Sequence, residues 1–344
     1  MTIKFVLTIC QFIFRCDIYE DCEDGEDEED CEFLKLDEID GYKSAIAPRH
    51  IKKGTPWPIY VGVEIVSFPQ IIAIEQRLIV DFHLSMRWYD PRLDYHNLKR
   101  GKESNPLAAE LLSELWIPRL TLLNGLSEFL TIVTEDDAKF YRGAVWRRHK
   151  PEVTDIENAI EDELFTGTKN PILVHREFYQ EFKCDFDLSW YPFDRQLCFM
   201  NFTVQGHTKK AIVLKAEDKE VKYLGQKFLV EYTVERQELI IPEMNSNYSV
   251  ASVHLYFRRR VVYHLLNIFL QSFLLVLTGY MSLFFNVNNF SDRVMVALTV
   301  MLVMASLNSS IQDALPKTAY FKYIDWWVLV SINTQVSHTY SKRC

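Results

Sequence analysis

A long uncharged stretch limits the folds open to this chain. From Val261 to Ser291 the sequence has no acidic or basic residue apart from His264. These 31 residues exceed the ~20 that a helix needs to cross the hydrocarbon core of a bilayer. A second uncharged stretch runs from Val294 to Gln312, and a third begins at Trp326. Because charges are dense and mixed up to Arg260, the sequence predicts a soluble domain followed by closely spaced membrane helices.

The sequence of the soluble part is typical of a β-structure. Between Pro58 and Arg258 it carries short runs such as YVGVEIVSF, RLIVDFHLSMRWY and KFLVEYTVE. Several runs alternate apolar and polar residues, which is typical of half-buried strands. Pro, Gly, Asn and Asp punctuate them at short intervals, so an all-β, immunoglobulin-like antiparallel sandwich is expected. The polar and acidic stretch from Pro151 to Pro171 interrupts the pattern, and we expect a long loop or insertion there.

The net charge of −9 has a local origin. Ten of the thirteen residues from Glu20 to Glu32 are acidic, and without them the balance is −9 + 10 = +1. The balance gives no support for a nucleic-acid partner. A solvated, disordered segment is the expected state of the run, with a weak cation-attracting role as the alternative.

The N-terminus resembles a secretory signal peptide. Lys4 precedes the apolar run FVLTICQFIF, which matches the positive start and hydrophobic core of such a segment. In the oxidising compartment that this implies, Cys184 and Cys198 can pair, and a Cys22–Cys31 pair stays open. The pairing of Cys16 is also open. No CxxC or HExxH pattern occurs, so no catalytic residue, metal site or cofactor is predicted.

The expected organisation has five parts. They are a signal peptide at 1–20, an acidic disordered segment at 21–45, a β-sandwich at 46–258, a transmembrane domain at 259–335 and a tail at 336–344.

The second uncharged stretch is two-faced. Hydroxyl-bearing residues recur there at helical spacing and share a broad stripe with two apolar ones: Thr299, Ser306, Ser309, Ser310, Met295 and Leu302. Such a stripe either packs on another helix or faces water. Asp292 and Asp313 bracket it, ~32 Å apart at ~1.5 Å per residue, which is about the hydrocarbon thickness. In an oligomer they would form two acidic rings at the mouths of a pore.

Several motifs together point to one family. A cysteine pair with thirteen intervening residues and a WYPFD centre precedes FRRRVVYHLLN, RVMVALTVMLVMAS and ALPKTAYFKYID. From Pro58 to Val330 the chain resembles the Cys-loop, or pentameric ligand-gated ion channel, family. Its second membrane helix looks like that of prokaryotic and invertebrate cation-conducting members.

The resemblance implies an architecture and partners. Five subunits would surround a pore, as a homo- or hetero-pentamer with related subunits, and a small extracellular ligand would bind between adjacent sandwiches. The subunit would be a multi-pass plasma-membrane protein with its N-terminal domain outside, in contact with the lipid bilayer and with permeant inorganic ions. Of the usual four helices this chain carries three. The third turns polar after YFKYIDWWVLV, so the resemblance implies a chain truncated in that helix.

The pore positions carry over residue by residue. The resemblance assigns the lumen-facing side of the second helix to Asp292, Met295, Thr299, Leu302, Ser306, Ser309 and Asp313. Asp292 takes the place of the inner acidic ring, and Leu302 that of the hydrophobic gate that closes by excluding water. Anion-conducting members typically carry Pro-Ala before the Arg. Here SDR puts a carboxylate there, so cation selectivity is expected.

The ligand-binding positions depart from those of amine-gated relatives, which hold a cation with aromatic rings. The matching positions are His83, Leu123, Gln205 and Tyr248, and only the last is aromatic. We therefore expect no acetylcholine-like amine as agonist. His83 is either a proton-sensitive gating group or a plain strand histidine.

Candidate coupling residues sit where the two domains would meet. They are Glu75, Pro192, Phe193, Asp194, Arg259, Pro316 and Lys317. Pairing of Glu75 or Asp194 with Arg259 or Lys317 would give this contact an electrostatic grip, and the alternative is that each charge is a solvated surface residue. The Tyr191–Pro192 bond is a candidate cis peptide. Asn201 and Asn247 fit the glycosylation acceptor pattern.

Two functions from different classes fit the sequence. The leading one is a subunit of an extracellular-ligand-gated cation channel with an unknown agonist. The alternative is a truncated, non-conducting, membrane-anchored binding or assembly partner of full-length subunits. An enzyme is a distant third, because no nucleophile–base or metal constellation is recognisable.

Overall fold

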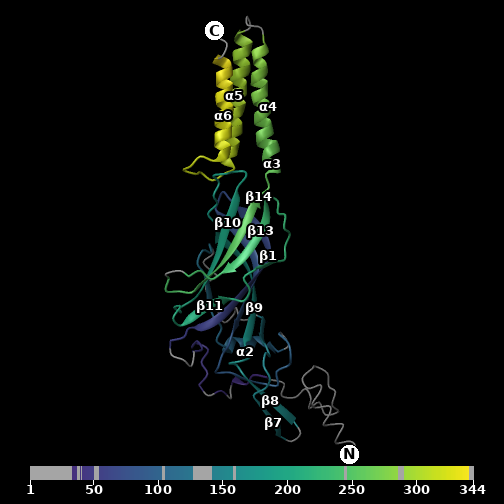
Figure 1. Ribbon diagram of the computed structural model, residues 1–344, viewed down its shortest axis with the longest axis vertical. Helices are drawn as coiled ribbons and strands as arrows, with labels where there is room; N and C mark the ends of the chain where they lie inside the picture. Colours follow the sequence, from purple (N-terminus) through teal and green to yellow (C-terminus); the bar gives the residue numbers. More distant parts are fainter. Residues whose placement is uncertain are drawn as a thin grey trace, which may run out of the picture.

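The chain forms an elongated molecule, with strands in its lower part and helices side by side at one end (Figure 1). The computed structural model describes residues 33–36, 39, 41–49, 54–102, 105–126, 142–157, 160–243, 246–285 and 290–340. The expected signal peptide, the acidic run and the first four cysteines lie outside these residues.

The larger sheet has seven strands. Its order is β11 (Ile212–Ala216), β1 (Trp57–Ile72), β2 (Arg77–Trp88), β9 (Ile172–Lys183), β6 (Arg142–Val145) and β4 (Pro106–Leu107), and β12 (Lys222–Tyr223) also pairs with β1. β1 and β2 form an antiparallel pair with Val63 opposite Leu84. Along β1 the residues Ile59, Val61, Val63 and Ile65 are buried and their neighbours are not, which is the alternation that the sequence predicted.

The smaller sheet closes the sandwich. Its order is β13 (Tyr232–Ile240), β14 (Val250–Arg259), β10 (Arg195–Val204) and β5 (Leu120–Leu122). Aromatic rings from both sheets meet in the core. Phe82 of β2 lies 6.0 Å from Phe202 of β10, and Phe68 of β1 lies 4.9 Å from Phe257 of β14, between ring centroids. The predicted β-sandwich is therefore confirmed, and its inner faces bury one continuous hydrophobic cluster.

The stretch from Pro151 to Pro171 is not the long loop that we expected. It contains β7 (Val153–Glu157) and β8 (Ile160–Thr166), which form a hairpin, and β8 pairs with β3 (Asp94–His96). Phe165 anchors the hairpin: it is fully buried, lies opposite Tyr95 of β3 and carries the Arg147 guanidinium 4.6 Å above its ring. The neighbouring strand supplies the pairing that the polar sequence did not signal.

Part of the segment expected to be disordered packs on the sandwich. Leu34 is buried in the core, and the carbonyl of Phe33 accepts a hydrogen bond from the His96 N–H at 2.8 Å. The hydroxyl of Tyr42 accepts the Trp116 N–H at 2.9 Å. The expectation of disorder for 21–45 was therefore wrong for these residues. Beyond them, the short helix α2 (Ala109–Glu114) precedes β5.

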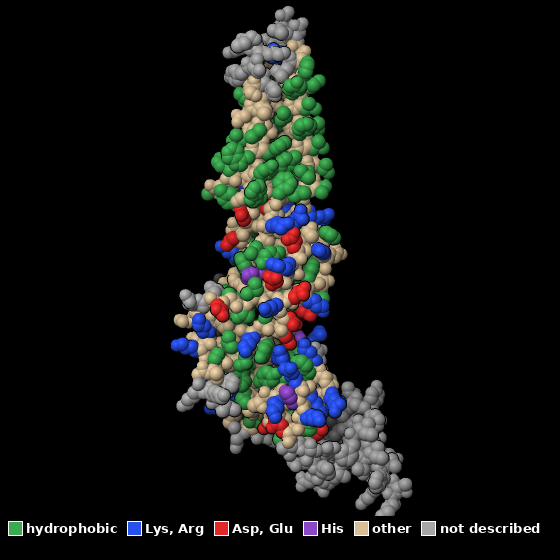
Figure 2. All heavy atoms as spheres, in the orientation of Figure 1, with side chains coloured by type: hydrophobic (Ala, Val, Ile, Leu, Met, Phe, Trp, Pro, Cys, Tyr) green, Lys and Arg blue, Asp and Glu red, His purple; other side chains and the backbone are tan. Residues whose placement is uncertain are grey.

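The helical end consists of three columns (Figure 1). The first comprises α3 (Val262–His264), the π-helical segment η4 (Leu265–Leu270), α4 (Gln271–Met281) and the 3₁₀ turn η5 (Ser282–Phe284); the others are α5 (Phe290–Asp313) and α6 (Tyr323–Tyr340). Two stretches, Val262–Met281 and Ser291–Asp313, are long and apolar enough to cross a membrane. α6 is not one of these candidate spans of the described chain, in keeping with its polar second half. Figure 2 shows apolar side chains over the helices and charged ones over the sandwich.

Candidate functional site

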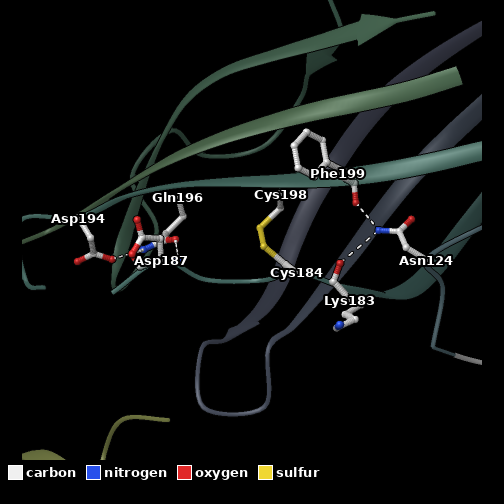
Figure 3. The surroundings of a disulfide bond; sticks show 8 residues. All are labelled: Asn124, Lys183, Cys184, Asp187, Asp194, Gln196, Cys198 and Phe199. Carbon is white, nitrogen blue, oxygen red and sulfur yellow. Dashed lines mark hydrogen bonds between the residues drawn. A yellow bond between two sulfur atoms is a disulfide. The ribbon is translucent and has the colours of Figure 1, made fainter. Parts of the chain in front are cut away.

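A disulfide-closed loop lies where the sandwich meets the helices. Cys184, directly after β9, is bonded to Cys198 of β10, with 5.2 Å between their Cα atoms, so the predicted disulfide is confirmed and joins the two sheets (Figure 3). The side-chain amide of Asn124 donates to the carbonyls of Lys183 at 3.2 Å and Phe199 at 2.7 Å, the residues adjoining the two cysteines. Sequence reasoning missed Asn124, and no motif marks it.

Hydrogen bonds hold the loop from inside. The buried amide of Gln196 donates to the Asp187 carbonyl at 2.7 Å and to the Asp194 carboxylate, and it accepts the Asp187 N–H at 3.0 Å (Figure 3). The hydroxyl and N–H of Ser189 donate to the Asp187 carboxylate at 2.6 and 3.0 Å, and these bonds lower its pKa. The loop therefore has one internally bonded shape, and its Tyr191–Pro192 peptide is cis.

An ion pair at the tip of the loop reaches the entry to the first helix. Arg259 Nε and Nη2 donate to the two oxygens of Asp194 at 2.9 and 3.2 Å, and the two side chains are only 3% and 2% exposed. This is the bidentate geometry that makes guanidinium–carboxylate bonds strong. Glu231 lies 3.5 Å from Arg259 but is largely exposed. Of the acid–base pairs that we considered, Asp194–Arg259 is present in the structure.

Two tyrosines enclose the guanidinium. The Arg259 Cζ lies 4.9 Å from the ring centre of Tyr191 and 4.6 Å from that of Tyr232. Burial raises the pKa of Tyr191 to about 12 and that of Tyr232 further, so both are neutral at physiological pH. Burial lowers the pKa of Arg259, but Tyr232 and Asp194 outweigh this effect, and the pKa stays above its ordinary value. The Tyr191 hydroxyl also hydrogen-bonds His264 Nδ1 at 3.1 Å, within the first helical column.

Aromatic rings of the loop contact both the first helical column and α6. Phe193 lies 6.1 Å from Phe269 and 5.8 Å from Tyr323, and Trp190 stacks on Tyr323 at 6.3 Å. The Tyr323 N–H donates to the Ser189 carbonyl at 2.9 Å.

The linker before α6 adds a further bond to the loop. The Leu188 N–H donates to the Tyr320 hydroxyl at 3.0 Å. We predicted Pro316 and Lys317 as linker contacts, but Lys317 is exposed and has no ion-pair partner among the described residues. The loop is instead reached by Tyr320 of the linker and by Tyr323, the first residue of α6, for which the aromatic run YFKYIDWW was the available signal.

Glu75 is placed differently from our expectation. It pairs with Arg77 across the turn between β1 and β2, and Arg77 also pairs with Glu181 of β9 at 3.2 Å. Its ion pair therefore lies within the sandwich, whereas we had considered Arg259 or Lys317 as partners.

α5 packs through one side only. Its buried residues are Ala297, Val300, Met304 and Ile311. The residues that the resemblance assigned to a pore are all exposed on the single chain: Asp292, Met295, Thr299, Leu302, Ser306, Ser309 and Asp313. Two residues along a helix correspond to a rotation of about 200°, so Met295 and Ala297 lie on nearly opposite sides. The predicted stripe thus faces away from α4 and α6.

The candidate ligand residues fall on two sheets. His83, on the outer face of β2, lies 3.4 Å from Glu177 of β9. Leu123 follows β5, and its N–H donates to the carbonyl of Asn201 in β10. The β10–β14 pairing ends at Thr203 and Val250, and Gln205 and Tyr248 each lie two residues outside it. Leu123 and Tyr248 are about half exposed, so three candidates lie at the edge of the smaller sheet and His83 lies on the larger one.

The two glycosylation candidates differ in access. Asn201 lies within β10, opposite Ser252 of β14, and is partly buried. Asn247 is exposed just before β14. Asn247 is therefore the more accessible of the two.

Comparison with known proteins identifies the family. The model of the neurotransmitter-gated ion-channel ligand binding domain matches residues 34–154 and 160–266. The chain is 24% identical over 281 residues to the gamma-aminobutyric acid receptor subunit beta-4 of Gallus gallus, which covers 80% of this chain and 52% of that subunit. It therefore spans about half the length of this relative. The chain belongs to the Cys-loop family of pentameric ligand-gated ion channels, as the disulfide loop and the sandwich indicated.

Proposed function

We propose that this chain is a subunit of a pentameric, extracellular-ligand-gated channel that conducts cations across the plasma membrane, with its sandwich outside. The observation that carries the proposal is the open side of α5. It combines hydroxyl groups at membrane depth with a carboxylate at each end, and it lies opposite the side that packs on α4 and α6. Five such sides around one axis would line a water-filled pore with acidic mouths.

Leu302 is the proposed gate. It is 73% exposed in the middle of the stripe, between Thr299 and Ser306. A large apolar side chain that is exposed on the single chain is expected to be covered in the assembled protein, by neighbouring subunits or by lipid. A ring of five leucines would exclude water and block ions until the helices move apart.

The junction is the proposed route from ligand to gate. Asp194 holds Arg259, which stands three residues before α3, and Phe193 contacts both Phe269 and Tyr323. A rotation of the sandwich would therefore pull on the first column by an ion pair and push on α6 through a ring. Pro316 and Lys317 remain proposed linker residues between α5 and α6, and Glu75 a proposed member of the coupling region.

The agonist is proposed not to be an acetylcholine-like amine. Three of the four candidate positions, His83, Leu123 and Gln205, carry no aromatic ring of the kind that holds a quaternary ammonium. The name of the Gallus gallus relative refers to gamma-aminobutyric acid, so amino acids belong in an agonist screen together with amines, protons and divalent cations.

The test is the reversal potential of the evoked current. In cells that express this chain, replacing external sodium by a large organic cation should shift the reversal potential negative, and replacing chloride should leave it unchanged. Asp292→Ala removes five charges from the ring of a homopentamer and should reduce the sodium-dependent shift, while Asp218→Ala on the exposed sandwich surface should not. A potential that follows chloride would overturn the selectivity. Surface expression without current under every ligand would favour the non-conducting assembly partner.

A further inference from the structure

Four cationic side chains surround two aromatic rings on the outer face of the larger sheet. We call this the basic–aromatic patch; it consists of Tyr60, Arg87, Lys102, Trp146, Arg148 and Lys215. Tyr60 of β1 stands opposite Arg87 of β2 and Lys215 of β11, so these three form a row across adjacent strands. None of them belongs to the ligand, pore or coupling candidates.

The rings hold the cations close together. The Arg87 Cζ lies 4.5 Å from the ring centre of Tyr60 and 5.8 Å from that of Trp146. Around Trp146 there are also Arg148 at 4.8 Å and the Lys102 Nζ at 5.7 Å. The Lys215 Nζ lies 5.9 Å from Tyr60. Because the four cations gather around the same two rings, their like charges repel one another. The attraction of each cation to the rings offsets only part of this repulsion.

The described chain supplies too little negative charge to this patch. Glu217 lies 3.5 Å from Arg87 and 3.9 Å from Lys102, and it is the one carboxylate within ion-pair distance of the four cations in the part of the chain that the structure describes. Arg87 is more than nine-tenths buried, and its Nε makes no hydrogen bond with a described group. Arg148 and Lys215 are exposed. Four positive charges against one negative charge leave an excess of three.

Phe33 is the first described residue after the acidic run, and hydrogen bonds connect it to residues beside this patch. Glu32 is followed by Phe33, whose carbonyl accepts the His96 N–H. Leu98 lies two residues after His96, and its carbonyl accepts a hydrogen bond from Arg147 Nη1 at 2.6 Å. Arg147 stands between Trp146 and Arg148 in the sequence. Phe33 is thus linked through His96 and Leu98 to Arg147, the sequence neighbour of two patch residues, and thirteen extended residues at ~3.3 Å each can span about 43 Å.

We propose that the acidic run Glu20–Glu32 docks on the basic–aromatic patch of its own chain. Ten carboxylates tethered beside four cations have a high effective concentration, so the contact needs little intrinsic affinity. The run replaces the missing counter-charge of Arg148 and Lys215. This proposal does not depend on the channel function.

The experiment uses zero-length coupling of carboxylates to lysines in the full chain, followed by mass spectrometry. Acidic residues of 20–32 should couple to Lys102 and Lys215 at least several-fold more than to Lys227, an exposed lysine on the loop between β12 and β13. Coupling at the patch should fall several-fold in 1 M salt, where the screening length is about 3 Å. Equal coupling at Lys227, or no effect of salt, would overturn the proposal.

Two further arms identify the occupant. In a mixture of isotopically light and heavy chains, the coupled peptides should come from one chain, and mixed light–heavy pairs would show that a second copy's run is bound instead. Arg148→Glu places a carboxylate on the patch and should reduce coupling at Lys102 and Lys215, whereas Lys227→Glu should leave it unchanged. Unchanged coupling in the Arg148 variant would also contradict the proposal.

Discussion

Removing the charge of Asp194 tests the junction at its centre. Asp194→Asn keeps the size of the side chain but takes away the counter-ion of Arg259. Among the residues that the structure describes, the other carboxylate within ion-pair distance of Arg259 is Glu231, whose side chain is 63% exposed and 3.5 Å away. The variant therefore leaves a guanidinium that is 3% exposed with weak compensation.

The expected cost follows from this burial. Breaking a buried pair by removing one partner costs about 3–5 kcal/mol. The Tyr191 and Tyr232 rings remain and each retains about 0.5–2 kcal/mol of attraction for the cation, so the lower end, about 3 kcal/mol, is expected. For a domain of about 200 residues this corresponds to a decrease of about 6–12 °C in the unfolding midpoint.

The assay is thermal unfolding of the full chain in detergent at a fixed scan rate, since membrane proteins often unfold irreversibly. A double-mutant cycle with Arg259→Gln isolates the pair: the decrease in unfolding midpoint of the double variant should fall short of the sum of the two single decreases by about 4–12 °C. The matched control is the pair between Lys222 and Glu64, also an ion pair at 3.4 Å but with side chains 66% and 47% exposed. A surface pair of this kind contributes about 0–1 kcal/mol.

Equal shifts for the two pairs would refute the reasoning, because a buried bidentate pair should contribute more than an exposed single contact. A large effect of Asp194→Asn without coupling to Arg259 would place the cost elsewhere, in the hydrogen bond from Gln196 to Asp194. In that case the ion pair would not be the contact that ties the loop to the first helix.

Three other perturbations have expected outcomes. Replacing Cys184 and Cys198 together by serine should lower stability by about 3 kcal/mol, because the disulfide closes a loop of about 15 residues, and a reducing agent should reproduce this loss in the wild type only. Burial lowers the pKa of His254, although a nearby acid acts in the opposite direction. The stability that neutral His254 contributes is therefore complete above pH ~6.5 and is lost as the pH falls through the folded pKa. His254→Gln should flatten the decrease in unfolding temperature below pH ~6.5. A Cβ at Gly279 would collide with the side chain of Gln335, which donates a hydrogen bond to a carbonyl of α4. Gly279→Ala should therefore cost about 1–3 kcal/mol of stability in the same thermal assay. Adding Gln335→Ala to this variant should restore part of the loss.

The sandwich was predictable because its pattern is local. Alternation along β1 assigns Ile59 and Val61 to one face, and the same spacing recurs in the facing strands. The spacing of Cys184 and Cys198 with its WYPFD centre indicated the loop, and the charge gaps indicated the helices. Each of these signals lies within one segment of the chain.

Contacts between segments were harder to anticipate. The hairpin β7–β8 is polar, and it is anchored by Phe165 against a strand some 70 residues earlier in the sequence. Tyr323 reaches the disulfide loop because of how the helices are placed against the sandwich, and the aromatic run around it does not by itself specify that contact. Glu75 forms its ion pair with Arg77 inside the sandwich, and not with a cation across the junction. Asn124 bonds two backbone groups beside the disulfide, and such a role leaves no periodic trace.

The most direct test of the account is the leak current of a gate variant, since it needs no knowledge of the agonist. Leu302→Ser introduces a polar group into the proposed ring of leucines, and it should produce a constitutive current that reverses with the sodium gradient. Leu277→Ser, on an exposed leucine of α4 outside the proposed pore, should produce none. No leak from Leu302→Ser at normal surface expression, or an equal leak from Leu277→Ser, would contradict the claim that α5 lines a cation pore.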